Sequence, residues 1–241
     1  MKQIACLATI LIIVQIADAQ VTEGKVIYEQ KIDMWRRIPA EDAQTRSMIP
    51  QTRTTKFQLQ FANNQSMYKA IEEEPDLSEQ NNNGGLVIRM GGAAENEYYK
   101  NFTTQRAVNK IDMMGEIYLV DDSLRTFKWK LEEGETKTIM GHACKKATGK
   151  SERGTEITAW YAEDIQISAG PEQFNGLPGL ILGIDANKGE IVYNAIAMDK
   201  KVEEKIIKAP SKGKKVTNAE FTKIQTQVMG NSNGPVRIRM N

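Results

Sequence analysis

The chain has 241 residues, of which 40% are hydrophobic and 26% are charged, values typical of a globular protein and unlike those of a disordered or fibrous one. Its 32 Lys and Arg nearly balance its 31 Asp and Glu, which argues against a general nucleic-acid binder, because phosphate contacts require a basic surface. One His and two Cys cannot form a closed four-ligand zinc site of the usual type. We therefore expect no nucleic-acid partner and no cofactor.

The first segment, residues 1–19, is predicted to be a secretory signal peptide. Met1-Lys2 supplies a positive start, Ile4 to Ile16 is almost wholly apolar, and Ala17-Asp18-Ala19 is a cleavage signal. The apolar run is shorter than the roughly 20 residues that a transmembrane helix requires, and no other segment approaches that length. The mature chain would therefore begin at Gln20 and carry no transmembrane segment.

The two cysteines fit this interpretation. Cys6 lies at the start of the apolar run, whereas the lipid-anchored cysteine of a bacterial lipoprotein follows such a run, so Cys6 would leave with the peptide. Cys144 would remain as the only cysteine of the mature chain, and no intramolecular disulfide is expected. The fold would then depend on its hydrophobic core, for which about 220 residues suffice.

Short alternating runs of apolar and polar residues, separated by turn residues, predict β-strands through most of the mature chain. Phe57, Leu59 and Phe61 alternate with glutamines, and the Asn-rich turn that follows predicts a hairpin. A spacing of about 8 to 12 residues without intervening helices favours an antiparallel meander over βαβ units. The predicted strands are 26–32, 57–61, 67–71, 86–90, 97–101, 107–111, 116–120, 125–131, 137–148, 156–161, 180–185 and 190–198.

Two stretches in the first half interrupt the strands. Residues 39–48 predict a short helix, with Pro39 in its first turn and Pro50 beyond its end. Residues 72–85 are acidic and rich in Asn, which is typical of a long mobile loop.

The C-terminal region predicts one further helix. Thr217 to Glu220 has the pattern of a capping box, and Val216 precedes it where a hydrophobic staple to Phe221 would start. Phe221, Ile224 and Val228 fall on one helical stripe, and Gly230 is a stop signal. We therefore expect a single β-rich domain at 20–230 and a flexible tail at 231–241. The predicted fold class is mainly β (α+β), a curved antiparallel sheet or half-barrel meander with a C-terminal helix.

The most distinctive motif is Gly176-Leu177-Pro178-Gly179-Leu180-Ile181. Pro178 followed by Gly179 predicts a type II turn, because the third position of that turn requires a positive φ. Leu180, Leu182 and Ile184 then predict a strand with one apolar face. A structural role as a rigid turn competes with a functional one, in which the glycines let the backbone of a partner approach closely.

This motif resembles that of the GLPGLI family of secreted Bacteroidetes proteins, and the likeness extends from about Gly24 to Met198. The residues that carry the rest of it are Phe57, Leu59, Phe61, Ser66, Tyr68, Gly141, Cys144, Lys146, Ala147, Thr148, Trp160, Tyr161, Ile165, Ile167, Gly170 and Pro171. The resemblance implies an exported β-rich domain, periplasmic or associated with the outer membrane, with a curved sheet like that of periplasmic lipoprotein carriers. It implies no activity. Gln166 stands where a Pro is expected, and His142 where an aromatic residue is expected.

Met140, His142 and Cys144 alternate in the sequence, so on a strand they would share one face. Thioether, imidazole and thiolate groups suit Cu(I) or Zn(II). The three positions would span about 13 Å, so only His142 and Cys144 form a realistic pair of ligands. The competing interpretation is a partly buried strand face with a buried free thiol, and we expect no metal.

Seven lysines lie between residues 200 and 215, with only Glu203 and Glu204 among them. Such a patch suits contact with anionic lipid or with a partner, and it equally suits a solvated loop and strand end. The sequence does not separate these interpretations.

The main functional expectation is a non-enzymatic binding protein of the cell envelope, whose curved sheet wraps an apolar groove for lipid or for the apolar segment of an envelope protein. The alternative is a structural or assembly module of an outer-membrane complex that acts through an exposed sheet edge, favoured by a filled interior and a long unprotected edge. An enzyme that uses carboxylates is a third hypothesis. The residues expected to line the groove are Phe57, Leu59, Phe61, Phe127, Trp129, Leu180, Leu182 and Ile184.

Overall fold

The computed structural model describes residues 21–71, 96–151 and 154–230. Four predicted segments lie outside the described residues: the signal peptide, the loop at 72–85, the strand at 86–90 and the tail at 231–241.

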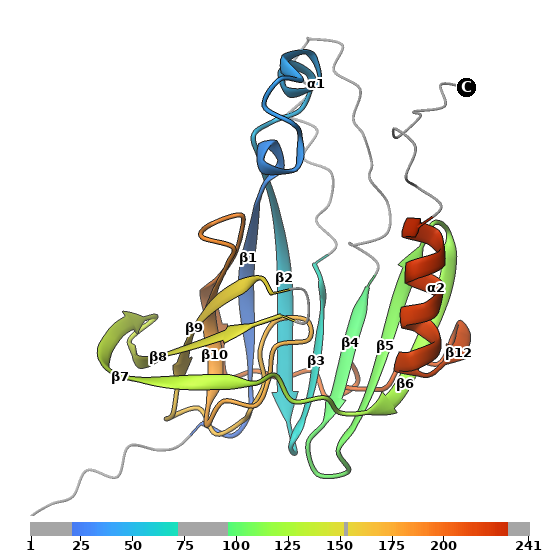
Figure 1. The fold of residues 1–241 in the computed structure, drawn as a ribbon. Coiled ribbons are helices and arrows are strands. Elements are labelled where there is room, and N and C mark those ends of the chain that lie inside the picture. Colours follow the sequence, from blue (N-terminus) through green and yellow to red (C-terminus); the bar gives the residue numbers. More distant parts are fainter. Residues whose placement is uncertain (1–20, 72–95, 152–153, 231–241) are drawn as a thin grey trace, which may run out of the picture.

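The described residues form one curved sheet of twelve strands (Figure 1), in the order β12-β6-β5-β4-β3-β2-β1-β11-β10-β9-β8-β7. Neighbouring strands are antiparallel, except that β12 pairs with β6 in parallel. The prediction of a mainly β, curved antiparallel sheet with a C-terminal helix is therefore confirmed. The strands are β1 (Gly24–Asp33), β2 (Thr52–Ala62), β3 (Gln65–Ala70), β4 (Glu97–Asn101), β5 (Arg106–Met113), β6 (Glu116–Ser123), β7 (Trp129–Ile139), β8 (His142–Lys150), β9 (Glu156–Ala162), β10 (Leu180–Ala186), β11 (Ile191–Asp199) and β12 (Lys214–Val216).

Most predicted strands overlap the observed ones with bounds that differ by at most five residues, and two depart further from the structure. The run at 125–131 becomes a strand only from Trp129 onward, because residues 124–128 form the link between β6 and β7. The run at 137–148 is a hairpin, in which Met140 and Gly141 form a two-residue turn with φ of 52° and 83° between β7 and β8. Positive φ at both central residues is what such a hairpin turn requires.

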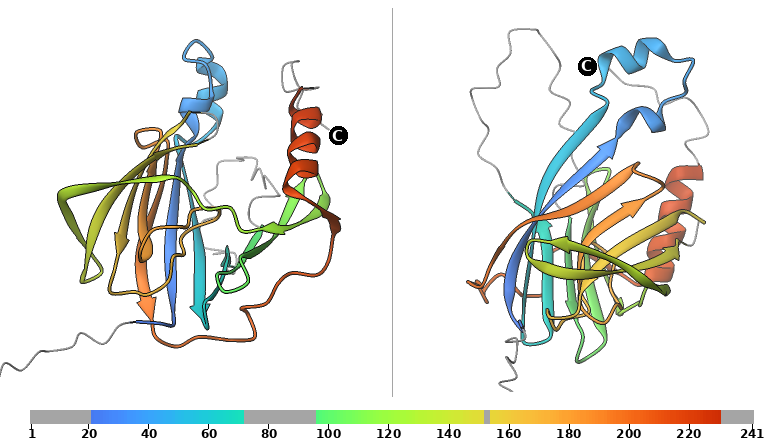
Figure 2. Two further views of the ribbon diagram at one scale, coloured as in Figure 1. Left: turned by 60° about the horizontal axis from the view of Figure 1, so that its bottom comes forward. Right: turned by 90° about the vertical axis from the view of Figure 1, so that its left-hand side faces the viewer.

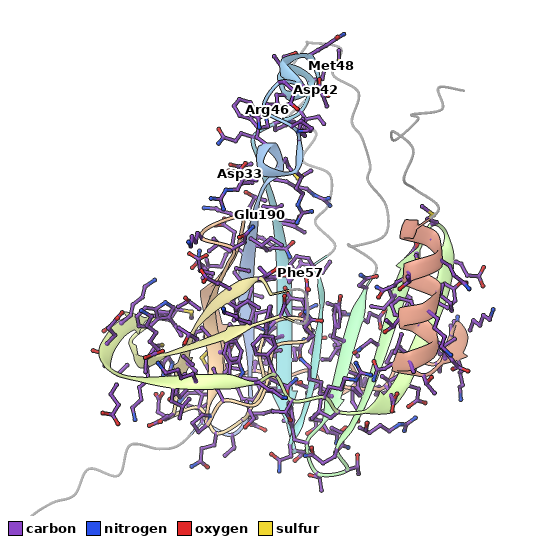
Figure 3. All side chains as sticks on the ribbon, viewed as in Figure 1. Asp33, Asp42, Arg46, Met48, Phe57 and Glu190 are labelled. Atoms are coloured by element: carbon purple, nitrogen blue, oxygen red, sulfur yellow. The ribbon has the colours of Figure 1, made fainter. Side chains whose placement is uncertain are left out.

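Between β1 and β2 the chain forms an arm that extends beyond the sheet (Figures 1 and 3). It contains a 3₁₀ helix, η1 (Met34–Arg37), and a short α-helix, α1 (Ala43–Met48). The Asp33 and Asp42 carboxylates cap these helices by accepting from the backbone N–H of Trp35 and Thr45. Because α1 begins at Ala43, Pro39 lies before the helix and not in its first turn.

The main core lies on the concave face of the sheet, where the connection between β9 and β10 covers the side chains of the strands. Residues 163–179, which we call the cover segment, link β9 to β10 and contribute Ile165, Ile167, Phe174 and Leu177 to the main cluster of buried side chains. On the sheet side, the ring of Tyr68 stacks on Phe57 with ring centroids 5.1 Å apart. The curved sheet therefore wraps a segment of its own chain.

The C-terminal helix, α2 (Asn218–Gly230), packs at the far edge of the sheet. Phe221 is buried with Val120 of β6 and Val216 of β12 in a cluster separate from the main core. The capping box is confirmed, because the Thr217 hydroxyl accepts from the Glu220 N–H and the Glu220 carboxylate accepts from the Thr217 N–H. Neither α-helix in the described part of the chain is long and apolar enough to cross a bilayer.

The connection from β11 to α2 crosses the opposite face of the sheet. We call residues 200–215 the strap; it runs along one end of the molecule (Figure 2). Ile207 is buried against Met67, Tyr99 and Val108, whose side chains point away from the main core. The Glu203 N–H donates to the Gln60 side-chain oxygen at 2.8 Å, which fixes the strap to β2.

Candidate functional site

The residues predicted to line an apolar groove belong to the core. Phe57, Leu59 and Phe61 share the concave face, as predicted, but each is at most 3% exposed because the cover segment lies over them. Phe127 and Trp129 are partly buried and pack around Phe174 of that segment. These side chains are therefore covered by the chain itself and are not open to a ligand.

The predicted apolar face of β10 is interrupted by a β-bulge. Leu180 pairs with Ala162, whereas Ile184 pairs with Ala159, three residues earlier on β9. Side chains three residues apart on a strand point to opposite faces, so Leu180 and Ile184 do not share a face. Leu182 lies in the bulge, and all three side chains are buried.

A polar pocket of about 530 Å³, which we call the loop pocket, lies among the connections at one end of the sheet. Figure 1 shows the β2–β3 and β4–β5 turns at the end opposite the arm. Four connections form the loop pocket: the β2–β3 turn, the β4–β5 turn, the link between β6 and β7, and the cover segment with its Gly-Leu-Pro-Gly motif. A volume of this size lies within the range of small-ligand sites. The lining residues are Asn64, Phe102, Gln105, Leu124, Thr126, Glu163, Gln166, Ile167, Ser168, Asn175, Gly176, Pro178 and Gly179.

Hydrogen bonds between neighbouring connections hold the pocket in shape. The Phe102 N–H donates to the Asn64 carbonyl at 2.9 Å, and the Leu124 N–H donates to the Gln105 carbonyl at 2.8 Å. The Asn175 amide donates to the Arg125 carbonyl at 3.0 Å, which joins the cover segment to the link between β6 and β7. The four connections are therefore tied to one another by hydrogen bonds within the chain.

The motif forms a tighter turn than the sequence predicts. Gly179 has a φ of 150°, within the positive range, but the Leu177 carbonyl accepts from the Gly179 N–H at 2.8 Å, and the Leu180 N–H donates instead to Ile165. This is a three-residue γ-turn around Pro178, not a type II turn. A Cβ at Gly179 would lie 2.1 Å from the Ala162 carbonyl oxygen, so only Gly fits this approach of two backbones.

The pocket offers neutral hydrogen-bonding groups. The side chains of Asn64, Thr126, Gln166 and Ser168 form no hydrogen bond with any other described residue, so their donors and acceptors are available. The one carboxylate, that of Glu163, accepts from the Lys145 ammonium at 2.7 Å. The arrangement suits a neutral polar ligand and lacks the paired titratable groups of a general acid and base.

A second polar cluster, which the sequence analysis did not predict, lies between the sheet and the cover segment. The Lys100 ammonium on β4 donates to the carbonyls of Gly170, Glu172 and Phe174 in the cover segment. Burial lowers the pKa of Lys100 to about 7 and raises that of the Glu172 carboxyl, which accepts from the Gln30 amide. Only 3% of Lys100 is exposed, so this cluster anchors the cover segment from within.

The three candidate metal ligands, Met140, His142 and Cys144, do not share one strand face. Met140 lies in the β7–β8 turn, which removes it from the strand face that the alternation predicted. His142 Nδ1 lies 2.5 Å from the Asp164 carboxylate. Cys144 is fully buried, its thiol donates to the His142 carbonyl at 3.6 Å, and burial raises its pKa to about 11. Among the residues that the structure describes, no three His, Cys, Asp or Glu side chains are placed to hold one metal ion.

The sequence indicates part of the loop pocket described above. The motif glycines and Pro178 were identified, and Gln166 was noted as a departure from the GLPGLI pattern. Asn64, Gln105 and Thr126 were missed, because they lie on three separate connections that no sequence spacing relates.

Comparison with known proteins supports the fold and part of the family resemblance. Residues 148–183, which include the motif, match a family described as "Protein of unknown function (Porph_ging)", named for the Bacteroidetes species Porphyromonas gingivalis. No curated protein matches the chain.

Two similar solved structures are "Structure of PNGF-II in P21 space group" and "Structure of PNGF-II in C2 space group", with TM-scores of 0.55 and 0.54. Both are 14% identical over 85% of this chain, which spans 33% and 32% of those chains. A third, the crystal structure of an uncharacterized conserved protein from Thermus thermophilus, has a TM-score of 0.42 and 9% identity, over 83% of this chain and 93% of that chain. This chain therefore spans about a third of the PNGF-II structures, and at 14% identity the likeness concerns the fold alone.

Proposed function

We propose that this chain is an exported, non-enzymatic binding protein of the cell envelope, of the GLPGLI type, that binds an extended polar polypeptide segment of a partner in its loop pocket. The observation that carries the proposal is the position of the motif. Gly176, Pro178 and Gly179 line a polar pocket together with residues that carry neutral amide and hydroxyl groups. Such groups match the donors and acceptors of a peptide backbone.

The chemistry of the pocket favours a peptide over lipid. The apolar face of the sheet is occupied by the cover segment, so an acyl chain or an apolar segment would have to displace Phe174 and Leu177 from the core. Gly176 is exposed, and a Cβ there would lie 2.2 Å from Thr126 Cγ2, so the glycine lets the cover segment pack closely against the link between β6 and β7 at the pocket rim.

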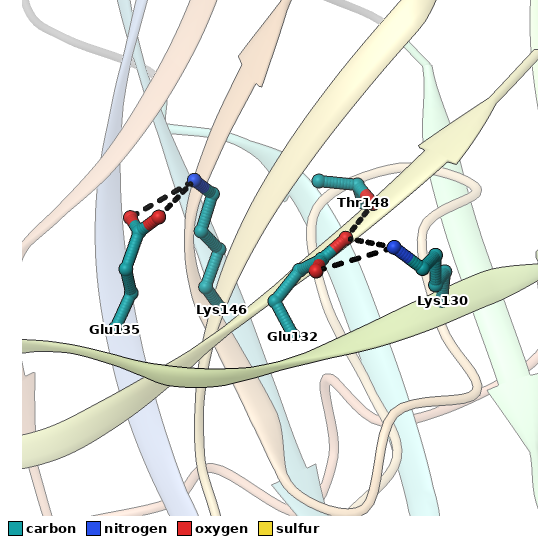
Figure 4. A network of polar contacts seen from close by, with 5 residues as sticks. All are labelled: Lys130, Glu132, Glu135, Lys146 and Thr148. Carbon is teal, nitrogen blue, oxygen red and sulfur yellow. Dashed lines mark hydrogen bonds and ion pairs between the residues drawn. The ribbon is translucent and has the colours of Figure 1, made fainter.

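An assembly role through a sheet edge is less well supported. β7 is an edge strand of eleven residues, but residues 132–135 bulge away from β8 and carry three glutamates. Glu132 accepts from Lys130 and Thr148, and Glu135 accepts from Lys146 (Figure 4). Bulges and charged side chains are features that deter an edge from pairing with another strand.

Export is part of the proposal and rests on the predicted signal peptide. Val21, two residues beyond the predicted cleavage site, pairs with the cover segment, where its N–H donates to the Asp164 carbonyl and its carbonyl accepts from the Gln166 N–H. Cleavage after Ala19 would thus leave the paired part of the chain intact. An intact mass of secreted protein that retains residues 1–19, or that includes a lipid adduct, would contradict this part.

The binding proposal is tested by selecting linear peptides from a displayed library on the folded protein and measuring their Kd by fluorescence anisotropy. Thr126 is exposed at the pocket, so Thr126→Arg should fill the pocket without disturbing the core and raise Kd at least about tenfold. Thr138→Arg, an exposed threonine on β7, is the matched control and should leave Kd unchanged. Failure to select any peptide, or equal Kd values for parent and Thr126→Arg, would refute the proposal.

A further inference from the structure

We propose that the strap, residues 200–215, docks the protein on the surface of an anionic lipid bilayer through electrostatic contact. The proposal concerns a different part of the molecule from the loop pocket and does not depend on it. It starts from seven lysines opposed by only two glutamates within one connection. The lysines are Lys200, Lys201, Lys205, Lys208, Lys212, Lys214 and Lys215.

The sheet holds the strap so that its lysines face outward. Val202, Ile206 and Ile207 pack against the sheet, and Ile207 is buried there. All seven lysines are exposed. Figure 2 shows the strap running along one end of the molecule from β11 to β12. Because the apolar side chains point inward, the positive charge forms the outer layer of this part of the molecule.

Little of this charge is offset nearby: the pKa of Asp121 is lowered mainly by Arg106 and only in part by Lys215, and Lys214 Nζ lies 6.0 Å from the Tyr118 ring centroid. None of the seven lysines forms an ion pair with another residue in the described ranges, whereas the neighbouring cations on β5 are paired: Arg106 with Asp121 at 2.7 Å and Lys110 with Glu97 at 3.2 Å. The whole chain has a net charge of only +1, so the rest of it is net negative. Such a distribution orients the molecule in the field of a negative surface, with the strap toward that surface.

The composition of the strap favours a bilayer over a protein or nucleic acid. A specific protein interface needs large apolar or aromatic anchors, and the strap exposes none. Binding of single-stranded nucleic acid uses aromatic rings on which bases stack, and these are absent from residues 200–215. Lysines act as point charges without the planar fork of arginine, which suits a diffuse array of lipid phosphates.

The test uses the folded chain without residues 1–19 and co-sedimentation with vesicles of phosphatidylcholine alone or mixed with phosphatidylglycerol. We expect binding only to the mixed vesicles and a steep loss of binding as salt is raised. In the triple variant Lys205→Gln, Lys208→Gln, Lys212→Gln, the partition coefficient should fall by about 100-fold, because each lysine near such a surface contributes roughly a fivefold factor and the three factors multiply.

The matched control replaces three exposed lysines on another part of the surface, in the triple variant Lys128→Gln, Lys137→Gln, Lys150→Gln. This control has the same net charge as the strap variant and should retain most of the binding. Replacing the three strap lysines by arginine should also retain it. Equal binding to neutral vesicles, or an equal loss in both glutamine variants, would overturn the proposal. Thr126→Arg should bind vesicles like the parent, so failure of the pocket proposal is distinguishable from failure of this one.

Discussion

Gly179 shows how a single residue fixes the motif in place. Its backbone passes so close to β9 that even a methyl group would collide with the Ala162 carbonyl oxygen, at 2.1 Å. The same contact holds the rim of the loop pocket against the sheet, since Gly179 and Pro178 line that pocket. Local backbone geometry and the shape of the candidate site therefore depend on one position.

We predict that Gly179→Ala lowers the free energy of unfolding by about 2–4 kcal/mol, because the collision adds to the strain of a positive φ. Gly189→Ala is the control: its φ is 88°, but nothing lies within 4 Å of the added Cβ, so it should cost about 1 kcal/mol. Urea unfolding of the two variants measures the difference. Equal values would mean that the close approach to Ala162 does not stabilise the native state.

At this scale the sequence predicts the sign of φ at Gly179, but neither the type of turn nor the contact. The order Pro178-Gly179 is sufficient to expect a positive φ. The carbonyl that excludes a side chain belongs to Ala162, on another strand, and the bulge at Leu182 sets the register between the two. Because alternation alone carries no sign of that bulge, the sequence wrongly placed Leu180 and Ile184 on one face.

Among the elements, β7 is a long edge strand whose charged bulge deters pairing with a strand of another molecule. It is an edge strand in the described sheet, and its central residues leave the ladder to carry Glu132, Glu133 and Glu135. The lysines that pair with two of these glutamates come from β7 itself and from β8. A partner strand would have to bury these charges, which opposes association along this edge.

Replacing Glu132, Glu133 and Glu135 by threonine should therefore promote self-association, because threonine favours the strand and removes the charge. Sedimentation velocity should show dimers or larger species at concentrations where the parent is monomeric. The control variant replaces the exposed Glu23, Glu41 and Glu116 by threonine and changes the net charge by the same amount. If both variants sediment alike, the charged bulge is not what protects the edge.

The strands themselves could largely be predicted from alternation, since eleven of the predicted runs overlap strands of the structure. The errors fall where tertiary contacts override local pattern. Residues 125–128 alternate like a strand but serve as a link, where the Arg125 carbonyl accepts from Asn175. The cover segment was missed as the occupant of the sheet interior, because its apolar residues alternate irregularly between turns.

For the molecule as a whole, Lys100 links the sheet to the segment that fills it. Its pKa of about 7, lowered by burial, means that the unfolded chain binds more protons than the native one between pH 7 and the ordinary lysine pKa of 10.5. Stability must therefore rise with pH through that window. The raised pKa values of Cys144 and Tyr28 act in the opposite direction at higher pH, so the window is clearest below about pH 9.

We predict that, between about pH 7 and pH 9, the unfolding free energy of the parent rises by about 2 kcal/mol relative to that of Lys100→Met, which lacks the titrating group. Lys150→Met, at an exposed site, should behave like the parent. Urea unfolding at each pH gives the comparison. A constant difference between parent and Lys100→Met would contradict the prediction; if that variant does not fold, an NMR titration of Lys100 in the parent should show a midpoint near 7.

The order of the strands has a consequence for how the chain reaches this structure. Apart from β12, the sheet consists of two local meanders, β1–β6 and β7–β11. They join where β1 pairs with β11, as between Gln30 and Tyr193, which are 163 residues apart. Pairings so distant in sequence form slowly. The edge of β1 that pairs with β11 must stay unpaired until residue 199 is available, and Val26 and Tyr28, which are buried in the native state, lie on that strand. A chain that emerges N-terminus first therefore passes through a long-lived half-sheet that is prone to aggregate.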